Sequence, residues 1–472
     1  MRILALEAST TSAKAMLYDS AADHTEVLTK EYCGKALPAG GTGQAEEICR
    51  QAAEAGRALL QGRSADLISL SGTWHSVLLC DREMRPVTRV YQWNDTGAKE
   101  ICRRYREDED YVKDYYRRTG CMVNAVYPSF RLEWMRAQGM DVDHSHILSL
   151  GSYMTWRMTG ERISTRCMTS ASGLMNIHTK NYDGRILEER NLKEWQLSRL
   201  VDAGEAFPLL KEAADYLGVP AGIPVIPANS DGGLNQIGAG ATGKGSATFS
   251  VGTSGAIRLT TEKPLIPDTP STWCYLSPKG YLSGAATNGC CNCTDWVKRR
   301  LFPEGTGYDE IEKDHGPLEE TPVFLPFLFG ERCPGWNDER EGGFVGVKAA
   351  HRAGDLYRAA QEGVLFHLYQ CYQVLAENNG VPSEVLLSGG ILKSRQWTQM
   401  AADIFGVPMT VSHVEQGSLL GACVLGMEYL GLIADAADYR LPASEVIEPD
   451  FSRKEFYEKK YRRYLEAYRR NG

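Results

Sequence analysis

Two stretches of the chain share a pattern in which short apolar runs flank a turn of small hydroxyl residues. Residues 3–7 and 13–18 are apolar on either side of the polar turn 9–12. The same pattern returns over residues 247–259, around the turn 252–255. Apolar runs separated by a small polar turn are typical of β-hairpins. The pattern therefore predicts two hairpins with Gly, Ser and Thr residues at their tips.

A second pair of similar stretches follows the two hairpins in the same order. Residues 67–71 form a run that ends in Ser-Gly, and residues 385–388 form one that ends in Ser-Gly-Gly. One such echo is common among Gly/Ser-rich turns, but two in the same order indicate an internal duplication. Duplicated α/β halves with facing hairpins are typical of actin-like, ribonuclease-H-like ATPases, in which a nucleotide cleft lies between two domains. Small tip residues let backbone N–H groups reach phosphate oxygens.

Apolar residues recur at helical spacing elsewhere in the chain. The spacing predicts helices over residues 45–61, 355–377, 394–405 and 454–470, with Ser394 as the N-cap of the third. The second of these is apolar on more than one face, as a buried helix would be. The last is basic and rich in tyrosine, which indicates a solvated terminal helix rather than a nucleic-acid site.

A glycine-rich stretch at residues 238–245 predicts the connection between an N-terminal domain of residues 1–241 and a C-terminal domain of residues 246–472. The stretch nearly matches a phosphate-binding P-loop that would end in Lys244. Gly245, however, stands where Ser or Thr should bind magnesium, and a strand is expected to follow instead of a helix. We therefore interpret the stretch as a turn.

Composition and charge narrow the class of protein. The 472 residues are 43% hydrophobic and 24% charged, which is typical of a globular chain and, at this length, of two domains. The net charge of −8 and the pI of about 5.7 disfavour nucleic acid and anionic membranes as partners. The N-terminus lacks the apolar core of a secretory signal, and no window has the length of a membrane span. We therefore expect a cytoplasmic protein with no nucleic-acid or membrane partner.

The 13 cysteines are scattered without framework spacing, which predicts reduced thiols. Cys290, Cys291 and Cys293 match no usual zinc spacing and have no histidine close by, so we interpret them as free thiols. Oligomeric state is not readable from the sequence, and a homodimer is left open.

An ordered set of short motifs extends from the first hairpin to residue 422. The set comprises Trp93-Asn94-Asp95, Thr119-Gly120, Arg131-Leu132-x-Trp134, Asn229-x-Asp231, the second hairpin tip, Asn288-Gly289, residues 324–334, Gly343-Phe344-x-Gly346, Ser388-Gly389-Gly390, residues 394–403 and Gly421-Ala422. It resembles the FGGY carbohydrate kinase family, which includes gluconate, xylulose, ribulose and glycerol kinases. Residues 331–337 and 362–369 look most like the gluconate kinases. The resemblance implies ATP and Mg²⁺ as cofactors, and phosphoryl transfer to a polyol or sugar acid.

The base of such a transfer is predicted to be Asp231. It follows the apolar run 223–227, and a carboxylate at a strand end can accept the proton of an attacking hydroxyl. An Asp at this place is as often the cap of the next helix. The resemblance decides for catalysis, because the family's base occupies this position.

The resemblance also implies which residues hold the nucleotide. The phosphates are assigned to both hairpin tips, through Thr10, Thr11, Ser12, Lys14, Gly252, Thr253 and Ser254. The adenosine is assigned to Gly289, Gly389, Gly390 and Ser394. Glu7 and Ser9 depart from the family pattern, which has Asp and Gly there. Glutamate keeps the charge, so Glu7 is predicted to act on magnesium through water.

Dense hydrogen bonding and stacking on aromatic faces are typical of polyol sites. The resemblance implies that the substrate is bound by Trp74, His75, Trp93, Asn94 and Asp95, with Asp231 shared. A carboxylated substrate would need a cation, for which Arg131 is the candidate. Gluconate is the first substrate and xylulose or another pentulose the second. A catalytically weak, nucleotide-binding regulatory protein is the alternative of another class, motivated by Glu7 and Ser9.

Overall fold

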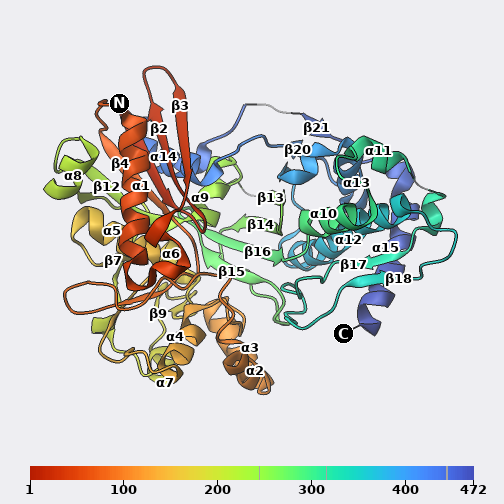
Figure 1. The fold of residues 1–472 in the computed structure, drawn as a ribbon, viewed down its shortest axis with the longest axis horizontal. Helices are drawn as coiled ribbons and strands as arrows, with labels where there is room; N and C mark the ends of the chain where they lie inside the picture. The colour runs from red at the N-terminus through yellow and green to blue at the C-terminus, as the bar shows by residue number, and fades with distance from the viewer. Residues whose placement is uncertain (244, 315, 443–444, 472) are drawn as a thin grey trace.

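The chain folds into two α/β halves that lie side by side along the long axis of the molecule (Figure 1). The computed structural model describes residues 1–243, 245–314, 316–442 and 445–471. Over these residues, the N-terminal half is built on a six-stranded sheet and the C-terminal half on a seven-stranded one. No helix of the described chain is both long and apolar enough to cross a bilayer.

The N-terminal sheet is mixed and carries the first hairpin at its centre. Its strands are β1 (Arg2–Ala8), β2 (Ser12–Asp19), β3 (His24–Glu31), β4 (Leu67–Gly72), β11 (Phe207–Pro208) and β12 (Pro224–Ser230). They are arranged in the order β11-β12-β4-β1-β2-β3. β1 is antiparallel to β2 and parallel to β4, which in turn is parallel to β12.

The C-terminal sheet repeats this arrangement around the second hairpin. Its strands are β13 (Ser246–Val251), β14 (Gly255–Thr261), β15 (Trp273–Leu276), β16 (Tyr281–Thr287), β19 (Glu384–Ser388), β20 (Met409–Val411) and β21 (Val446–Ile447). The order is β15-β16-β14-β13-β19-β20-β21. β13 is antiparallel to β14 and parallel to β19, which is parallel to β20. Both predicted hairpins and the predicted duplication are therefore confirmed.

Strand register gives a residue-by-residue match between the halves. In the first, Glu7 lies between Ser71 on β4 and Lys14 on β2. In the second, Ser250 lies between Ser388 on β19 and Ala256 on β14. The row Ser71–Glu7–Lys14 thus corresponds to the row Ser388–Ser250–Ala256, each one step from its hairpin tip.

The four helices expected from apolar spacing are confirmed within one or two residues at each end. They are α1 (Gln44–Leu60), α12 (Ala353–Asn379), α13 (Arg395–Phe405) and α15 (Lys454–Arg470). Ser394 caps α13 as predicted, because its Oγ accepts from Trp397 N at 3.0 Å. The other elements around the sheets are α5 (Leu150–Thr159), α6 (Arg166–Ser170), α8 (Lys211–Leu217), α10 (Cys291–Leu301), α11 (Tyr308–Lys313), β5 (Leu78–Cys80), β6 (His146–Leu148), β7 (Ile163–Thr165), β10 (Arg199–Val201), β17 (Val323–Leu325) and β18 (Gly343–Val345).

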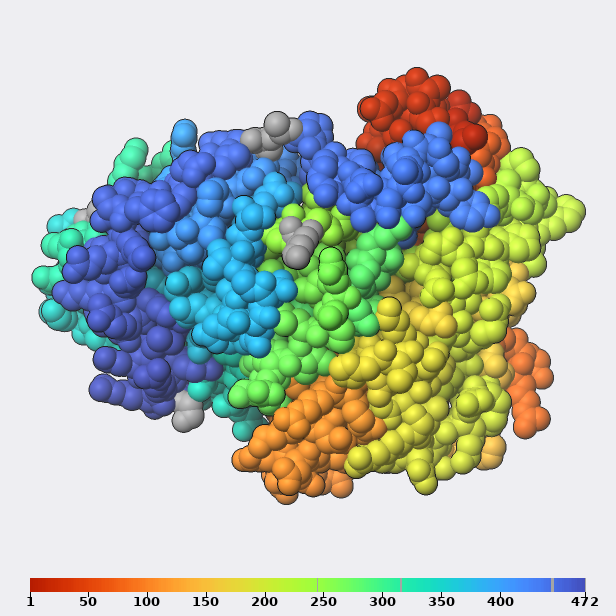
Figure 2. All heavy atoms as spheres, turned by 180° about the vertical axis from the view of Figure 1, so that it is seen from behind, coloured from red at the N-terminus to blue at the C-terminus, as the bar shows by residue number. Residues whose placement is uncertain are grey.

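Two helices connect the halves at the centre of the molecule. α9 (Asp231–Gly238) follows β12, and α14 (Gly417–Tyr429) follows β20. Leu419, Ala422 and Val424 of α14 share one apolar cluster with β1, β4 and α9. α14 therefore covers the N-terminal sheet although it belongs to the second half of the sequence. From behind, Figure 2 shows this late blue segment reaching the red N-terminal strands.

The boundary between domains at residues 242–245 stays a prediction. The chain leaves α9 at Gly238 and enters β13 at Ser246, so a strand follows the glycine-rich stretch as expected. Lys244, the lysine of the P-loop-like run, lies outside the described residues.

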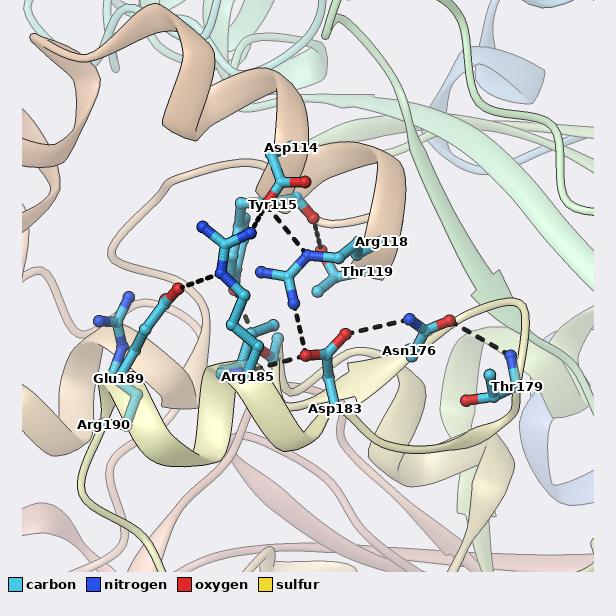
Figure 3. A network of polar contacts seen from close by, with 12 residues as sticks. Asp114, Tyr115, Arg118, Thr119, Asn176, Thr179, Asp183, Arg185, Glu189 and Arg190 are labelled. Carbon is cyan, nitrogen blue, oxygen red and sulfur yellow. Dashed lines mark hydrogen bonds and ion pairs between the residues drawn. The ribbon is translucent and has the colours of Figure 1, made fainter.

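A helical insertion lies between β4 and β12 in the sequence and borders the candidate active site described below. Its elements are α2 (Lys99–Arg106), α3 (Glu109–Thr119), α4 (Pro128–Ala137), α7 (Gly184–Glu189), β8 (Met175–Asn176) and β9 (Asn181–Tyr182). A polar network joins α3 to α7 and to the β8–β9 turn (Figure 3). At its centre, Asp183 pairs with Arg118 and accepts from Asn176 Nδ2 at 3.0 Å. Asp183 also caps α7, so one buried carboxylate fixes three elements.

The insertion is joined to β15 of the other half. Cys274 N donates to Gly120 O at 2.9 Å, and Leu276 N donates to Ser170 Oγ at 2.9 Å. The hydroxyls of Tyr127 and Tyr275 are 2.8 Å apart. Gly120 has φ +68°, and a Cβ there would meet Cys274 O at 2.1 Å, so only glycine fits. This seam holds the two halves together along one side.

Candidate active site

The tip of the first hairpin closes on itself through two serines. Ser9 Oγ donates to Ser12 O at 2.8 Å, and Ser12 N donates to Ser9 Oγ at 3.1 Å. Thr10 Oγ1 accepts from Trp93 Nε1 at 3.0 Å, and Thr11 is exposed. Ser9, which departs from the family's glycine, therefore braces the turn and leaves Thr10 and Thr11 at the tip.

Glu7 and Lys14 form an ion pair beneath that tip. Lys14 Nζ is 3.0 Å from Glu7 Oε1, and Glu7 is only 2% exposed. Glu7 Oε2 accepts from Ser71 Oγ at 2.9 Å and also from the hydroxyl of Ser418 on α14. The predicted phosphate ligand Lys14 is thus engaged by Glu7, within reach of the hairpin tip.

The second hairpin tip is a backbone turn surrounded by glycines. Gly252 N donates to Ser254 O at 3.0 Å, and Gly252 O accepts from Cys291 N at 2.9 Å. Thr253 and Ser254 are exposed. Gly389 has φ +100°, and a Cβ there would meet Val251 O at 2.5 Å. Gly389 therefore packs against the second hairpin tip. The sequence had assigned it to the adenosine instead.

The other residues assigned to adenosine have structural partners. A Cβ on Gly289 would meet Pro326 O at 2.0 Å, so close backbone packing requires glycine there. A Cβ on Gly390 would meet Cys291 Sγ at 3.0 Å. Ser394 is 6% exposed, and its hydroxyl donates to Glu312 Oε1 at 2.6 Å. Their contact with a nucleotide stays a prediction.

Asp231 is the first residue of α9 and faces the space between the halves. Its Oδ1 accepts from Gly232 N at 2.8 Å and from Trp74 N at 3.4 Å. Burial and then the nearby charge of Glu7 raise the pKa of Asp231 to about 6, against these hydrogen bonds and the cation Arg258. Ser230, not Asp231, caps α9, since its Oγ accepts from Gly233 N. The competing interpretation of Asp231 as a helix cap is therefore wrong.

Asp231 lines a pocket of about 250 Å³ between the two halves. The N-terminal half contributes Thr73, Trp74, His75, Trp93, Asp231 and Gly232. The C-terminal half contributes Ser254, Arg258, Trp273, Tyr275, Ala286 and Arg332. Because Trp93 binds Thr10 and lines the pocket together with Ser254, both hairpin tips border this space. The pocket has the size and the aromatic lining of a small-polyol site.

Trp74 forms one wall of the pocket. Its ring lies 5.0 Å from Tyr275 and 6.1 Å from Trp273, and its Nε1 donates to Cys167 O at 3.1 Å. A Cβ on Gly232 would meet the Trp74 ring at 2.3 Å, so glycine after Asp231 makes room for this wall.

His75 presents a neutral imidazole to the pocket. Its Nδ1 is 2.8 Å from Ala171 O and must therefore carry the ring proton, which leaves Nε2 as an acceptor. Burial, and then the cation Arg332, lower the pKa of His75 to about 3. His75 therefore accepts a hydrogen bond from a hydroxyl at neutral pH without carrying charge.

Asn94 and Asp95 are not brought into the pocket wall. Asn94 is exposed. Asp95 pairs with Arg89 Nη2 at 2.6 Å and accepts from Gly97 N at 3.1 Å, which makes it a turn former. A substrate role for these two residues stays a prediction that the geometry does not support.

Arg131 is buried away from the pocket, so the sequence-based choice of this cation is not supported. Its guanidinium donates to the carbonyl oxygens of His75 at 2.9 Å and Ala125 at 3.0 Å, and to Asp95 O at 3.2 Å. Burial lowers its pKa to about 10. Arg131 thus positions the backbone beneath His75.

Two other arginines, which sequence reasoning missed, supply cations to the pocket. They are Arg258 on β14 and Arg332 in the loop between β17 and β18. A signal for Arg258 was present, because it is the one charged residue in the otherwise apolar run 256–259. Arg332 stood inside a motif quoted for the family resemblance but was not assigned a role.

Magnesium would find few protein ligands here. No group of three or more His, Cys, Asp or Glu among the described residues could hold a metal ion. Mg²⁺ usually keeps several waters and uses one or two carboxylates together with substrate phosphates. Glu7 and Asp231 are close enough to interact electrostatically. These two carboxylates suit a Mg²⁺ ion that is bound mainly by substrate phosphates and that the protein contacts through water.

Comparisons with known proteins agree with this architecture. The N-terminal domain model of the FGGY family of carbohydrate kinases matches residues 2–238, and the C-terminal domain model matches residues 247–428. The gluconokinase of Bacillus subtilis (strain 168) is 28% identical over 455 residues, 91% of this chain and 88% of the relative. A gluconate kinase structure from Lactobacillus acidophilus aligns with a TM-score of 0.93 at 27% identity, covering 99% of this chain and 97% of that one. A ligand-bound xylulose kinase from Lactobacillus acidophilus aligns with the same TM-score, 0.93, and the same coverage, 99% and 97%, at 28% identity.

Proposed function

Because the chain belongs to the FGGY family of carbohydrate kinases, we propose that it transfers the terminal phosphoryl group of ATP to a hydroxyl of a small sugar or sugar acid. Gluconate is the first substrate candidate, since relatives in both sequence and structure carry that activity in their names. The proposal includes a cytoplasmic location, in keeping with the composition.

The observation that carries the proposal is the placement of Asp231. Its carboxylate lies at the N-terminus of α9, in a pocket that both halves line and both hairpin tips border. A base with a pKa of about 6 is mostly ionised at neutral pH, yet basic enough to accept a proton in the transition state. Asp231 therefore accepts the proton of the attacking hydroxyl.

The pocket walls orient the sugar. His75 Nε2 accepts a hydrogen bond from a second hydroxyl, while Trp74, Trp273 and Tyr275 provide aromatic faces for C–H groups. The backbone seam under β15 keeps these rings in place. Such fixed positioning is the main contribution that a protein makes to phosphoryl transfer.

The nucleotide is assigned to the two hairpin tips. Backbone N–H groups at Thr10, Thr11 and Thr253 would donate to phosphate oxygens, and Lys14 would add a positive charge. Glu7 and Asp231 would hold Mg²⁺ through water, and the bound ion would supply positive charge beside the phosphates. When phosphates bind, the Lys14 ammonium group would interact both with them and with the Glu7 carboxylate.

ATP consumption by the purified protein tests the proposal, with gluconate, xylulose, ribulose, glycerol and glucitol as acceptors. Turnover on gluconate well above all others is the expected result. Turnover on a ketopentose alone would replace gluconate by a pentulose, the second candidate, which the similarity to a ligand-bound xylulose kinase favours. ATP binding with no turnover on any acceptor would overturn the kinase proposal and favour a regulatory protein.

A further inference from the structure

The wall of the pocket that belongs to the C-terminal half carries two positive side chains. Arg258 comes from β14 and Arg332 from the loop after β17, and both line the same 250 Å³ space as Asp231. Burial lowers the pKa of Arg258, the charge of Asp231 opposes that shift, and the charge of Arg332 adds to it, so the two arginines lie near enough to interact. Two like charges in one small pocket repel each other unless an anion lies between them.

Neither guanidinium has a protein partner among the described residues. Both lack a hydrogen bond or ion pair to any described side chain or carbonyl, and Arg258 Nε is buried without a partner. Asp231 attracts Arg258 electrostatically, but its hydrogen bonds go to Gly232 N and Trp74 N, and one carboxylate cannot balance two guanidinium charges. Both side chains are half-buried, and arginines that are shielded from water are ordinarily paired, so their donors are available to a ligand that enters the pocket.

The backbone around both arginines is held in position by contacts of the neighbouring residues. Next to Arg332, Cys333 N donates to Ala286 O at 3.1 Å, and Trp336 Nε1 donates to Ser271 O at 2.8 Å. Glu331 is fully buried and accepts from Tyr468 Oη at 2.7 Å. Across from Arg258, a Cβ on Gly284 would meet the Trp273 ring at 2.5 Å, so glycine lets that ring lie flat there. An ordered backbone at both positions limits the entropy lost when the side chains bind a ligand.

The fold itself does not require a cation at Arg258. Strand register matches Arg258 in the second hairpin with Met16 in the first, two positions beyond Ala256 and Lys14 respectively. Met16 is a buried apolar residue under α14. The same strand position is therefore satisfied by an apolar side chain where no ligand is to be held.

We infer that Arg258 and Arg332 form a carboxylate subsite that selects an anionic sugar acid over neutral sugars at the proposed kinase site. Guanidinium groups present paired donors that match a carboxylate, and charge-assisted hydrogen bonds are the strong ones. A neutral polyol would leave both cations unpaired, so a site of this kind rejects it by a large factor. The inference rests on the proposed function for the use of the pocket, but its binding step can be measured without turnover.

Calorimetry with gluconate and with glucitol, its neutral counterpart of equal carbon number, tests the subsite in the absence of nucleotide. The wild-type protein is expected to bind gluconate at least about tenfold more tightly than glucitol. Arg332→Gln and Arg258→Met should each weaken gluconate binding by about 10- to 100-fold, with glucitol and ATP binding unchanged within about twofold. Methionine is chosen at 258 because the matching strand of the other half already holds one. Arg300→Gln removes an exposed arginine on α10 and is the control.

The outcomes separate this inference from the kinase proposal. Equal binding of gluconate and glucitol by the wild type overturns the subsite. So does an equal fall in kcat for charged and neutral acceptors in the arginine variants, which would assign the arginines to the transferred phosphoryl group. A preference for gluconate that the arginine variants abolish supports the subsite even if no acceptor is phosphorylated, in which case only the kinase proposal fails. Thermal unfolding of each variant identifies any loss that comes from misfolding.

Discussion

The two halves of the molecule share one strand arrangement but carry different chemistry on it. At the row behind the hairpin tip and at the helix that follows the last parallel strand, the N-terminal half has ionisable or hydroxyl side chains, namely Ser71, Glu7, Lys14 and Asp231. The matching positions of the C-terminal half are small and uncharged, namely Ser388, Ser250, Ala256 and Gly417. At these positions the ionisable side chains lie in the N-terminal half, whereas the C-terminal half carries its charge further along β14, at Arg258.

The difference shows how a duplicated fold serves a reaction with two substrates. A phosphate cradle needs bare backbone and close approach, which the glycines around the second tip provide. Proton transfer needs a carboxylate with a raised pKa, and burial, followed by the charge of Glu7, raises the pKa of Asp231 in the first half. A single copy of the fold cannot supply both the bare backbone and the carboxylate at equivalent positions, but two copies can.

The largest expected effect comes from making the first half resemble the second at its catalytic position. Asp231→Asn removes the base and should lower kcat by about 10³-fold while ATP affinity, measured by calorimetry, changes less than twofold. The melting temperature should rise, because the folded state raises this pKa and so disfavours the charged carboxylate above pH 6. Asp108→Asn, at the N-cap of α3, is the matched control. Wild-type turnover by Asp231→Asn would remove the base assignment.

The ion pair beneath the first tip has no counterpart in the second half. Lys14→Met leaves the buried Glu7 carboxylate without its cation and should lower the free energy of unfolding by about 3 kcal/mol. Adding Glu7→Gln should restore most of that loss, because the uncompensated charge is then gone. Lys211→Met, which breaks an exposed pair with Asp215, should change stability by less than about 0.5 kcal/mol. Urea denaturation measures the stability of the wild type and of the three variants. If Lys14→Met lost as little stability as the Lys211→Met control, the buried ion pair would be contradicted.

Glycine at the second tip can be tested by a pair of substitutions with the same backbone strain. Gly389→Ala and Gly380→Ala both place a side chain at positive φ, but only position 389 has atoms in the way, with Val251 O at 2.5 Å. We expect losses of about 2 kcal/mol and about 1 kcal/mol respectively, and a raised KM for ATP only at 389. Equal effects at both positions would show that the second tip tolerates a side chain.

A pH profile gives the smallest effect and tests the first half alone. With Asp231 at a pKa of about 6, kcat/KM should be flat above pH 7 and about tenfold lower at pH 5. The fall follows protonation of the base, since His75 has a pKa near 3 and stays neutral throughout. A profile that remains flat down to pH 5 would assign the proton transfer to another group.

Local patterns were enough to predict the elements but not all of the pocket. The hairpins, α12 and α15 follow from spacing that spans neighbouring residues, and their bounds agree with the structure. Asp231 could be located in the fold because its strand and helix are contiguous in sequence, whereas its role as base came from the family resemblance and stays a prediction. Arg258 and Arg332 could not, because they meet only after two distant segments pack against α9 and β4.

Arg131 illustrates the converse error. Arg131 was the candidate cation for a substrate carboxylate, yet five backbone carbonyls outside the helices converge on its guanidinium. Only the three-dimensional path of the chain brings those carbonyls together around one side chain. The positive side chains that line the pocket are instead Arg258 and Arg332.

The crossing of α14 onto the N-terminal sheet has a consequence for biosynthesis. The first sheet is complete once β12 has left the ribosome, yet the apolar face formed by Ile3, Leu67 and Ile226 is covered by residues made roughly 190 positions later. At translation rates of about 5–20 residues per second, that face stays open for roughly 10–40 s. A nascent chain arrested before α14 would therefore expose the apolar face of its N-terminal sheet. It should bind chaperones that recognise exposed hydrophobic surface until synthesis resumes.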